Sequence, residues 1–279
     1  MTAARVIFVS DTHLSPDAPE AEDNWAAVVR YIDAASPDLV IHLGDLSLDG
    51  ARNPADVDYA RRQLDLLPVA WRAIPGNHDI GDNPFPGAPQ SMTVTDARRQ
   101  RWLDAIGPDY WSLNLPGWVL LAVNPQLAGS GLAAEASQWL WLADRLARVR
   151  PGQRIALLTH KPITATDAEV AEAPPYRFWP PAASRRVAEE FAGESMALVV
   201  SGHVHQSRIL SVDGTQHLWV PTTWAMLPDH VQAVIGAKRS GIMSLEFSAE
   251  VPVRPEFHEP AGIRQLTMTV DIPDRYHGR

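Results

Sequence analysis

Short apolar runs alternate with longer amphipathic stretches over most of the chain. Runs of four to eight apolar residues predict buried strands, and apolar residues recurring every three or four positions predict helices that cover them. The predicted strands are Val6–Val9, Leu39–Leu43, Ala70–Ile74, Trp118–Val123, Ile155–Leu158 and Leu198–Val200. The predicted helices are Glu20–Ala35, Pro54–Leu67, Thr95–Ala105, Ala134–Val149 and Ala182–Phe191. Strands separated by helices predict an α/β fold built from parallel βαβ units.

The pattern changes at about residue 206, where short strands follow one another through turns. The predicted strands are Arg208–Val212, Gln216–Val220, Gly241–Phe247 and Gln265–Val270. Asp213-Gly214 between the first two is a hairpin signal. We therefore expect one domain over residues 1–279, with a mostly β, largely antiparallel C-terminal part. The Pro-rich segment Ala173–Pro181 predicts a surface loop.

Polar side chains follow five of the predicted strands at the point where each strand ends. These segments are Ser10–His13, Gly44–Asp45, Pro75–Asp79, Thr159–His160 and Ser201–His205. In an open α/β sheet, ligands bind beyond the carboxyl ends of the strands. His203 and His205 are two residues apart, so in extended chain both side chains face the same side, as do Asp11 and His13. Glycine, which permits close approach of the backbone, precedes three of the polar groups, at Gly44, Gly76 and Gly202.

The donor atoms at these strand ends are two carboxylates, one amide oxygen and four imidazoles. The residues are Asp11, His13, Asp45, Asn77, His160, His203 and His205. Mixed oxygen and nitrogen donors without sulfur suit Mn, Fe, Zn, Co or Ni better than Ca or Mg. Each motif alone is more often a simple turn. As an ordered set, seven donors are too many for one such ion and predict two ions that share a carboxylate.

Composition narrows the range of partners. The formal net charge of −9 argues against binding of a nucleic-acid polymer, which needs a basic surface. It does not argue against a small phosphate ligand, because bound metal ions would make the local charge of the site positive. The chain has no cysteine, so disulfides and thiolate metal sites are excluded. No apolar stretch approaches the roughly 18 residues of a membrane span, and the N-terminal segment is too short for a signal peptide. We expect a soluble, cytoplasmic protein.

The ordered motifs resemble the calcineurin-like metallophosphoesterase superfamily. The match runs over Asp11-x-His13, Gly44-Asp45-x4-Gly50, Gly76-Asn77-His78-Asp79, His160 and Gly202-His203-x-His205. The segment Gly129–Leu146 is similar, more loosely, to the branch that holds class III cyclic nucleotide phosphodiesterases. The resemblance implies a four-layer α/β/β/α sandwich with a dinuclear metal centre at the carboxyl ends of the strands.

The resemblance also assigns roles. Asp11, His13 and His205 would hold the first metal ion. Asn77, His160 and His203 would hold the second, with Asp45 bridging the two. The ions would be divalent or mixed-valence, with Mn and Fe favoured and Zn, Co or Ni left open.

The resemblance further implies the chemistry. A hydroxide bridging the two ions would attack phosphorus, because metal binding can lower the pKa of water to roughly 7. His78 would protonate the leaving oxygen, and Asp79 would orient the His78 ring. The expected function is a phosphodiesterase for small phosphoester substrates such as cyclic nucleotides. The alternatives are a phosphomonoesterase acting on nucleotides or phosphoproteins and, less favoured, a non-catalytic metal-binding scaffold.

Several positions leave open questions. Lys161 stands where many relatives carry a second histidine, and would either meet substrate phosphate or be a solvated loop lysine. Asn124 stands where the branch often has an aspartate.

Asp82 and Asn83 could border the substrate site. The remaining residues of interest are His42 as a packed strand residue, His217 and His230 as possible pocket neighbours, His258 and His277 as surface residues, and Trp219 and Trp224 as core, interface or base-stacking residues. The Trp-rich stretch after residue 217 leaves a homo-oligomer possible.

Overall fold

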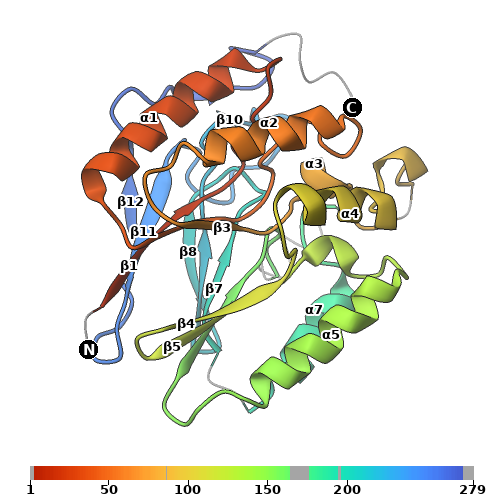
Figure 1. Cartoon of the computed structure of the whole chain (residues 1–279), viewed down its shortest axis with the longest axis vertical. Coiled ribbons are helices and arrows are strands. Elements are labelled where there is room, and N and C mark those ends of the chain that lie inside the picture. Colours follow the sequence, from red (N-terminus) through yellow and green to blue (C-terminus); the bar gives the residue numbers. More distant parts are fainter. Residues whose placement is uncertain (1–2, 86, 164–175, 194–195, 273–279) are drawn as a thin grey trace.

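The computed structural model describes residues 3–85, 87–163, 176–193 and 196–272. Two β-sheets pack face to face, and helices cover the outer face of each (Figure 1). This is the predicted four-layer α/β/β/α sandwich. Of the predicted features, His277 and the first part of the 173–181 loop, residues 173–175, lie outside the described residues.

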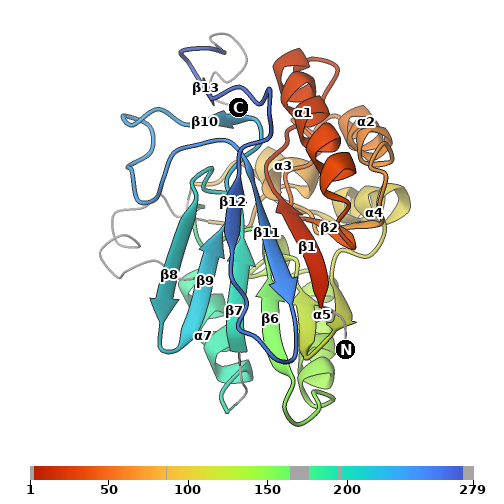
Figure 2. The ribbon, with the colours of Figure 1, turned by 90° about the vertical axis from the view of Figure 1, so that its left-hand side faces the viewer.

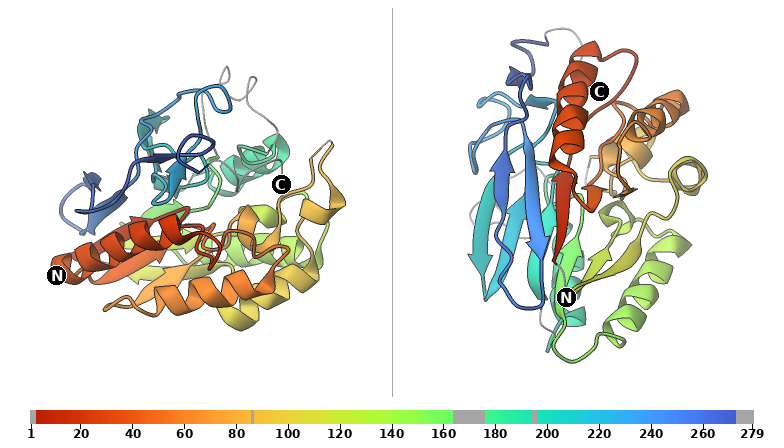
Figure 3. Two further views of the ribbon diagram at one scale, coloured as in Figure 1. Left: turned by 90° about the horizontal axis from the view of Figure 1, so that it is seen from above. Right: turned by 60° about the vertical axis from the view of Figure 1, so that its left-hand side comes forward.

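The first sheet has the order β12-β11-β1-β2-β3. Its strands are β1 Ala4–Val9, β2 Leu39–His42, β3 Trp71–Ala73, β11 Ile242–Phe247 and β12 Glu256–His258. β1, β2 and β3 are parallel, with Val6 opposite Leu39, whereas β11 runs antiparallel to β1. Figure 3 shows how β11 and β12 (blue) lie beside β1 (red), although they come from the other end of the chain.

The second sheet has the order β4-β5-β6-β7-β9-β8. Its strands are β4 Trp111–Leu115, β5 Trp118–Ala122, β6 Arg154–Leu158, β7 Met196–Ser201, β8 Arg208–Val212 and β9 Thr215–Trp219. Four central strands are parallel, and the edge strands β4 and β8 are antiparallel to their neighbours. Figure 2 shows β8, β9, β7 and β6 side by side. A separate parallel pair joins β10 Ala225–Met226 to β13 Leu266–Thr267.

The C-terminal strands are therefore less uniformly antiparallel than predicted. β9 runs parallel to β7 and extends the second sheet, while β11 and β12 extend the first. The predicted strand Gln265–Val270 shortens to β13.

Six helices and two 3₁₀ turns connect the described strands. They are α1 Pro19–Ala35, α2 Pro54–Leu64, α3 Asn77–Ile80, η1 Gln90–Met92, α4 Asp96–Ala105, η2 Pro125–Leu127, α5 Ala133–Leu146 and α7 Pro181–Glu190. α2 and α5 end three residues earlier than predicted. After α2 the chain turns, and Leu67 packs into the core from the loop instead of from the helix. No helix in the described part of the chain is long and apolar enough to cross a membrane.

Three buried apolar clusters hold the layers together. The inter-sheet core contains Phe8, Trp118 and Phe247. A second cluster, around Trp25 and Trp102, packs α1, α2 and α4 onto the first sheet. A third packs α5 and α7 onto the second sheet around a stripe that the helical spacing predicts, Trp139, Leu142 and Leu146. With both sheets covered, the loops that follow the parallel strands are the places where polar side chains can gather.

Candidate metal centre

The loops after β1, β2, β3, β6 and β7 bring the predicted ligands together. Three overlapping groups have potential ligand atoms within 4.8 Å of one another. The groups are Asp11–His13–His205, His13–Asp45–His78 and Asp45–His160–His203. His205 therefore lies with Asp11 and His13, whereas His203 lies with Asp45 and His160. The assignment of all seven residues as ligands remains a prediction.

The first group is almost fully enclosed. His13 Nε2 lies 3.3 Å from His205 Nε2, and His205 Nε2 lies 3.4 Å from Asp11 Oδ1. Asp11 Oδ1 and His13 Nδ1 are buried and make no hydrogen bond with any described residue. An ion with bonds of about 2.0–2.2 Å holds neighbouring donors roughly 3–3.5 Å apart. The spacing and the unsatisfied buried oxygen both fit a metal ion at this position.

Asp45 lies between the two halves of the site. Its Oδ2 is 3.3 Å from His160 Nε2 and 3.9 Å from His13 Nε2. Asn77 Oδ1 is 3.2 Å from the same nitrogen of His160. One carboxylate oxygen thus faces a histidine from each half, which is the geometry that a bridging ligand needs.

Backbone carbonyls orient the histidine rings. His160 Nδ1 donates to Leu43 O at 2.8 Å, and His205 Nδ1 donates to Ala225 O at 2.6 Å. Because carbonyls only accept, these contacts place the proton on Nδ1 and leave Nε2 free to bind a cation. His203 uses the opposite nitrogen, since its Nε2 donates to Tyr176 O at 3.1 Å and leaves Nδ1 as the acceptor.

The backbone at the predicted ligands is turned, not extended. Five of them have positive φ angles between 47° and 67°: Asp11, His13, Asp45, His203 and His205. The expectation that Asp-x-His and His-x-His converge through extended chain was therefore wrong. Such left-handed conformations are uncommon outside glycine and concentrate at functional sites. A turned backbone lets His203 and His205 reach different halves of the site.

Two glycines allow these loops to touch. A Cβ atom at Gly76 would overlap Asp45 Oδ1, and one at Gly202 would overlap Ser10 Oγ. Any side chain at either position would push apart the loops that carry the ligands. The close approach inferred from the glycine pattern is present at both positions.

His78 lies at the edge of the group and faces the cavity. Its ring centroid is 4.6 Å from that of His13, its backbone N–H donates to Asp45 Oδ1 at 2.8 Å, and its Nδ1 donates to Leu48 O at 2.7 Å. Asp79 was expected to orient this ring, but the described hydrogen bonds of its carboxylate go to other residues. The Asp79 carboxylate accepts from Gly76 N at 2.8 Å, from Ser47 N at 2.9 Å and from Ser47 Oγ at 2.6 Å. It thus positions the loop whose Leu48 carbonyl holds the ring.

The charges in the site are strongly coupled. Burial alone would lower the pKa of His160, but the Asp45 carboxylate beside it raises that pKa to about 9. Burial would raise the pKa of Asp45, yet His160 and His78 hold it well below its usual range. Burial and His78 together hold the pKa of His13 well below its usual value. The ionised Asp45 and the neutral His13 ring are in the protonation states that metal ligands require, whereas His160 must lose a proton before its Nε2 can bind an ion.

A cavity of about 380 Å³ opens onto four of the predicted ligands, Asp45, Asn77, His203 and His205. Its walls combine polar groups from the site with aromatic and apolar side chains. The lining residues are Asp45, Asn77, His78, Asp82, Phe85, Pro89, Met92, Tyr176, Arg177, His203, His205, Leu227 and Gln232. Phe85 and Tyr176 lie with ring centroids 6.0 Å apart. The positions of Tyr176, Arg177 and Gln232 in the cavity wall could not be predicted from the sequence, because no motif surrounds these residues.

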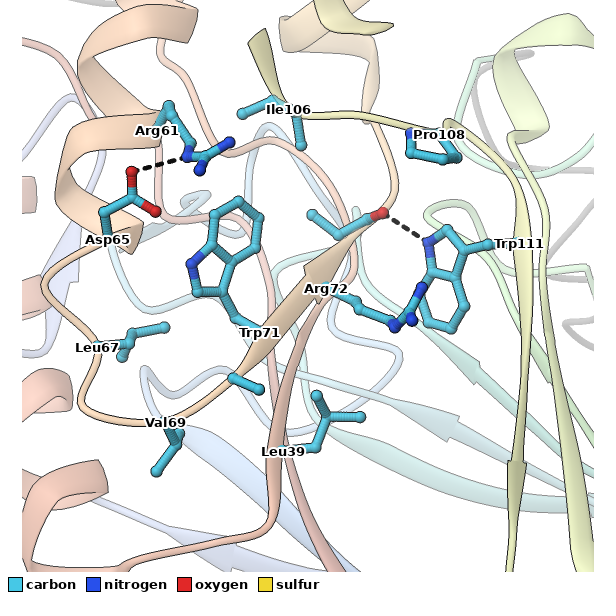
Figure 4. A pocket seen from close by; sticks show the side chains of 12 residues that line it. Leu39, Arg61, Asp65, Leu67, Val69, Trp71, Arg72, Ile106, Pro108 and Trp111 are labelled. Carbon is cyan, nitrogen blue, oxygen red and sulfur yellow. Dashed lines mark hydrogen bonds and ion pairs between the residues drawn. The ribbon is translucent and has the colours of Figure 1, made fainter.

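A larger cavity of about 600 Å³ lies elsewhere (Figure 4). It is formed around β3 and the start of β4, where Arg61 and Arg72 lie over the rings of Trp71 and Trp111. None of the predicted ligands lines it. Size alone therefore does not locate the candidate centre.

Lys161 differs from both of its expected roles. The side chain is fully buried, and its Nζ binds the Asp82 carboxylate and, at 2.8 Å, Asn83 Oδ1. It is therefore neither a solvated loop lysine nor free to meet a phosphate. Asp82 borders the cavity as expected, whereas Asn83 is buried and donates to the Pro125 and Ala128 carbonyls.

The other residues of interest are mostly structural. His42 is buried and bonds to Thr12 Oγ1 at 3.0 Å, as expected for a packed strand residue. Asn124 donates to Asp109 Oδ2 at 2.9 Å. Trp219 is core, and Trp224 is fully buried with its ring centroid 4.9 Å from that of His13. Neither tryptophan, nor His217 or His230, lines the cavity.

Similar proteins agree with this geometry. The family model described as calcineurin-like phosphoesterase matches residues 4–207. The 3',5'-cyclic adenosine monophosphate phosphodiesterase CpdA of Escherichia coli (strain K12) is 25% identical over 277 residues, covering 93% of this chain and 91% of that protein. A probable cyclic nucleotide phosphodiesterase of Synechococcus sp. is 27% identical over 264 residues, covering 90% of each chain.

Among solved structures, a dimetal phosphatase from Danio rerio has the same fold. It superimposes with a TM-score of 0.65 at 13% identity, covering 92% of this chain and 96% of that one. The family depends on a dinuclear metal centre, and the resemblance inferred from the strand-end motifs is confirmed. The chain belongs to the calcineurin-like phosphoesterase family and is a metal-dependent phosphoester hydrolase.

Proposed function

We propose that this protein is a phosphodiesterase for small substrates, with cyclic nucleotides as the leading class. The observation that carries the proposal is the cavity beside the ligand groups. Its volume of about 380 Å³ lies in the range of small-molecule sites, and aromatic and apolar side chains make up much of its wall. A flat base could pack there while its phosphate reaches the ligands. The names of the relatives that align with 90% or more of the chain support the same substrate class.

The metal ions would be held by the seven predicted ligands. Asp11, His13 and His205 would form one half, and Asn77, His160 and His203 the other. Asp45, which faces both halves, would bridge them. Mn and Fe are the favoured ions, with Zn, Co and Ni as alternatives. When bound, the two ions would polarise the phosphoryl oxygens and supply a nucleophile at neutral pH.

His78 would act as the general acid. Its Nδ1–H is held by Leu48 O, so Nε2 is the nitrogen that can carry a proton toward the leaving oxygen. Asp79 would be a positioning residue, because its carboxylate holds the Ser47 end of the loop that presents Leu48.

The test is hydrolysis by Mn-reconstituted protein of bis(p-nitrophenyl) phosphate beside p-nitrophenyl phosphate, followed by a series of cyclic nucleotides. We expect a higher kcat/KM for the diester and turnover of at least one cyclic nucleotide. Asp45→Asn is the control for contaminating activity, because it removes the bridging carboxylate. A monoester preference would shift the assignment to a phosphomonoesterase with the same ligands. Absence of turnover with both ions bound would favour the non-catalytic scaffold.

Two further expectations stay predictions. These are the cytoplasmic location and the possible homo-oligomer, which could not use Trp219 or Trp224 because both are buried in the fold.

A further inference from the structure

Arg177 is a buried cation for which no protein partner is described. The residue is only 6% exposed and lines the cavity beside the ligand groups. It makes no hydrogen bond, ion pair or ring contact with any residue that the structure describes. None of its nitrogens is among the fully buried atoms without a partner, so solvent in the cavity reaches the guanidinium. A cation that lines a cavity and has no partner among the described residues is available to an anion that enters that cavity.

The carboxylates that share this cavity are already engaged. Asp82 is bound by the ammonium group of Lys161. Asp45 faces His13 and His160 and accepts the His78 backbone N–H. The buried Lys161 thus neutralises an acidic residue of the cavity wall.

Arg177 is also tied to the ligand groups through its backbone. The carbonyl of Tyr176, the preceding residue, accepts a hydrogen bond from His203 Nε2 at 3.1 Å. This contact fixes the 176–177 segment against a predicted ligand. Arg177 therefore follows a residue bonded to His203 and lines the same cavity as this predicted ligand.

We propose that Arg177 is a substrate-binding residue whose guanidinium binds the phosphoryl group of the substrate. The inference rests on the proposed function insofar as it takes the substrate to be a phosphoester. Guanidinium presents paired N–H donors that match two oxygens of a phosphate, and it stays charged at any working pH. Its contribution should rise with the charge of the ligand, so it should be larger for a dianionic monoester or inorganic phosphate than for a monoanionic diester.

The first experiment measures the affinity of inorganic phosphate for Mn-loaded protein by isothermal titration calorimetry. Arg177→Gln and Arg177→Met should raise Kd about 10- to 100-fold, the scale of a lost charge-assisted hydrogen bond. Arg177→Lys should recover part of the affinity, because it restores the charge without the paired donors. Arg186→Gln is the matched control: this arginine lies on α7, is exposed and pairs with Glu190, so Kd should stay within about twofold.

Metal content, measured by mass spectrometry on the same samples, should be unchanged in every variant. Unchanged phosphate affinity in both Arg177→Gln and Arg177→Met would overturn the inference. Loss of metal together with loss of phosphate would overturn it too, because Arg177 would then support the ligands and not the substrate.

The kinetic arm separates this inference from the proposed function. For wild-type protein and Arg177→Gln, kcat/KM is compared on the chromogenic monoester and diester, with the larger loss expected on the monoester. If the wild-type protein hydrolyses neither ester and no cyclic nucleotide, yet phosphate binding depends on Arg177, the proposed function fails and the inference stands. If cyclic nucleotides are hydrolysed equally well by both proteins, the inference alone fails.

Discussion

His13 Nε2 and His205 Nε2 point at each other across 3.3 Å in a buried part of the site. The Nδ1–H of His205 is committed to Ala225 O, so its Nε2 presents a lone pair unless the ring is charged. Without an ion, His13 can carry its proton on Nε2 and donate to that lone pair, while its Nδ1 has no partner. A cation bound here would instead take the lone pairs of both Nε2 atoms, with Asp11 supplying compensating charge from 3.4 Å.

Metal binding should therefore be both stoichiometric and stabilising. We expect two Mn ions per chain, with about one in His205→Asn and fewer than one in Asp45→Asn, because Asp45 faces both halves of the site. Each ion at about a thousandfold excess over its Kd adds roughly 4 kcal/mol to the free energy of unfolding. Mass spectrometry and thermal melts with and without chelator measure the two effects. Equal metal content in Asp45→Asn and wild-type protein would contradict a bridging role.

Removal of the general acid should separate chemistry from metal binding. His78→Ala should keep both ions and lose at least about a hundredfold in kcat, the usual scale for proton transfer by a side chain. The loss should be smaller for substrates with a good leaving group such as nitrophenolate, which needs little protonation. Full activity in this variant, with the metal content intact, would remove the role.

The buried pair of Lys161 and Asp82 should be costly to break from one side only. Lys161→Met leaves the Asp82 carboxylate without its partner and should lower the free energy of unfolding by about 3–5 kcal/mol. The double variant Lys161→Met/Asp82→Leu should recover much of that loss, since neither charge remains buried. Urea denaturation of the two single variants and the double variant measures the coupling. Strictly additive effects would show that the two side chains do not stabilise each other.

His217 should make the fold sensitive to mild acid. Burial lowers its pKa from 6.5 to about 4, so the ring is neutral in the folded chain at pH values where it would be charged when unfolded. Stability from this group is present above pH 6.5 and is lost as the pH falls toward 4, by up to about 3 kcal/mol. His217→Gln should flatten the curve over that interval. The free energy of unfolding of both proteins is measured against pH in the presence of chelator, so that protonation of the metal ligands affects them alike. Parallel stability curves for wild-type protein and His217→Gln would contradict this role of His217.

The strands that the sequence missed are short or partly exposed. β4 mixes apolar and polar residues, and its burial falls from Trp111 to an exposed Asn114. β12 has only three residues and pairs at the edge of its sheet with β11. Neither forms the continuous apolar run by which a buried strand is recognised. Both exist because a neighbouring strand offers a free edge, which is a property of the assembled sheet.

In the site, too, some features could be predicted from local sequence patterns and others depend on contacts between distant segments. The sequence brought the predicted ligands to the ends of the strands, but it misjudged the partners of Asp79 and Lys161. Asp79 holds Ser47, and Lys161 holds Asp82, which lies 79 residues earlier. A charged residue in a loop carries no local mark of whether it will be buried or which partner it will meet.

The sequence by itself determined the family, the layered α/β architecture and the convergence of donor residues, because apolar periodicity and strand-end motifs are local properties of the chain. Only the tertiary structure decided which carbonyl orients each ring, which partners hold Asp79 and Lys161, and that the walls of the cavity include Tyr176 and Arg177. Those relationships join segments that are distant along the chain. They depend on left-handed turns at the ligands and on close contacts at Gly76 and Gly202, which form only when both sheets are in place.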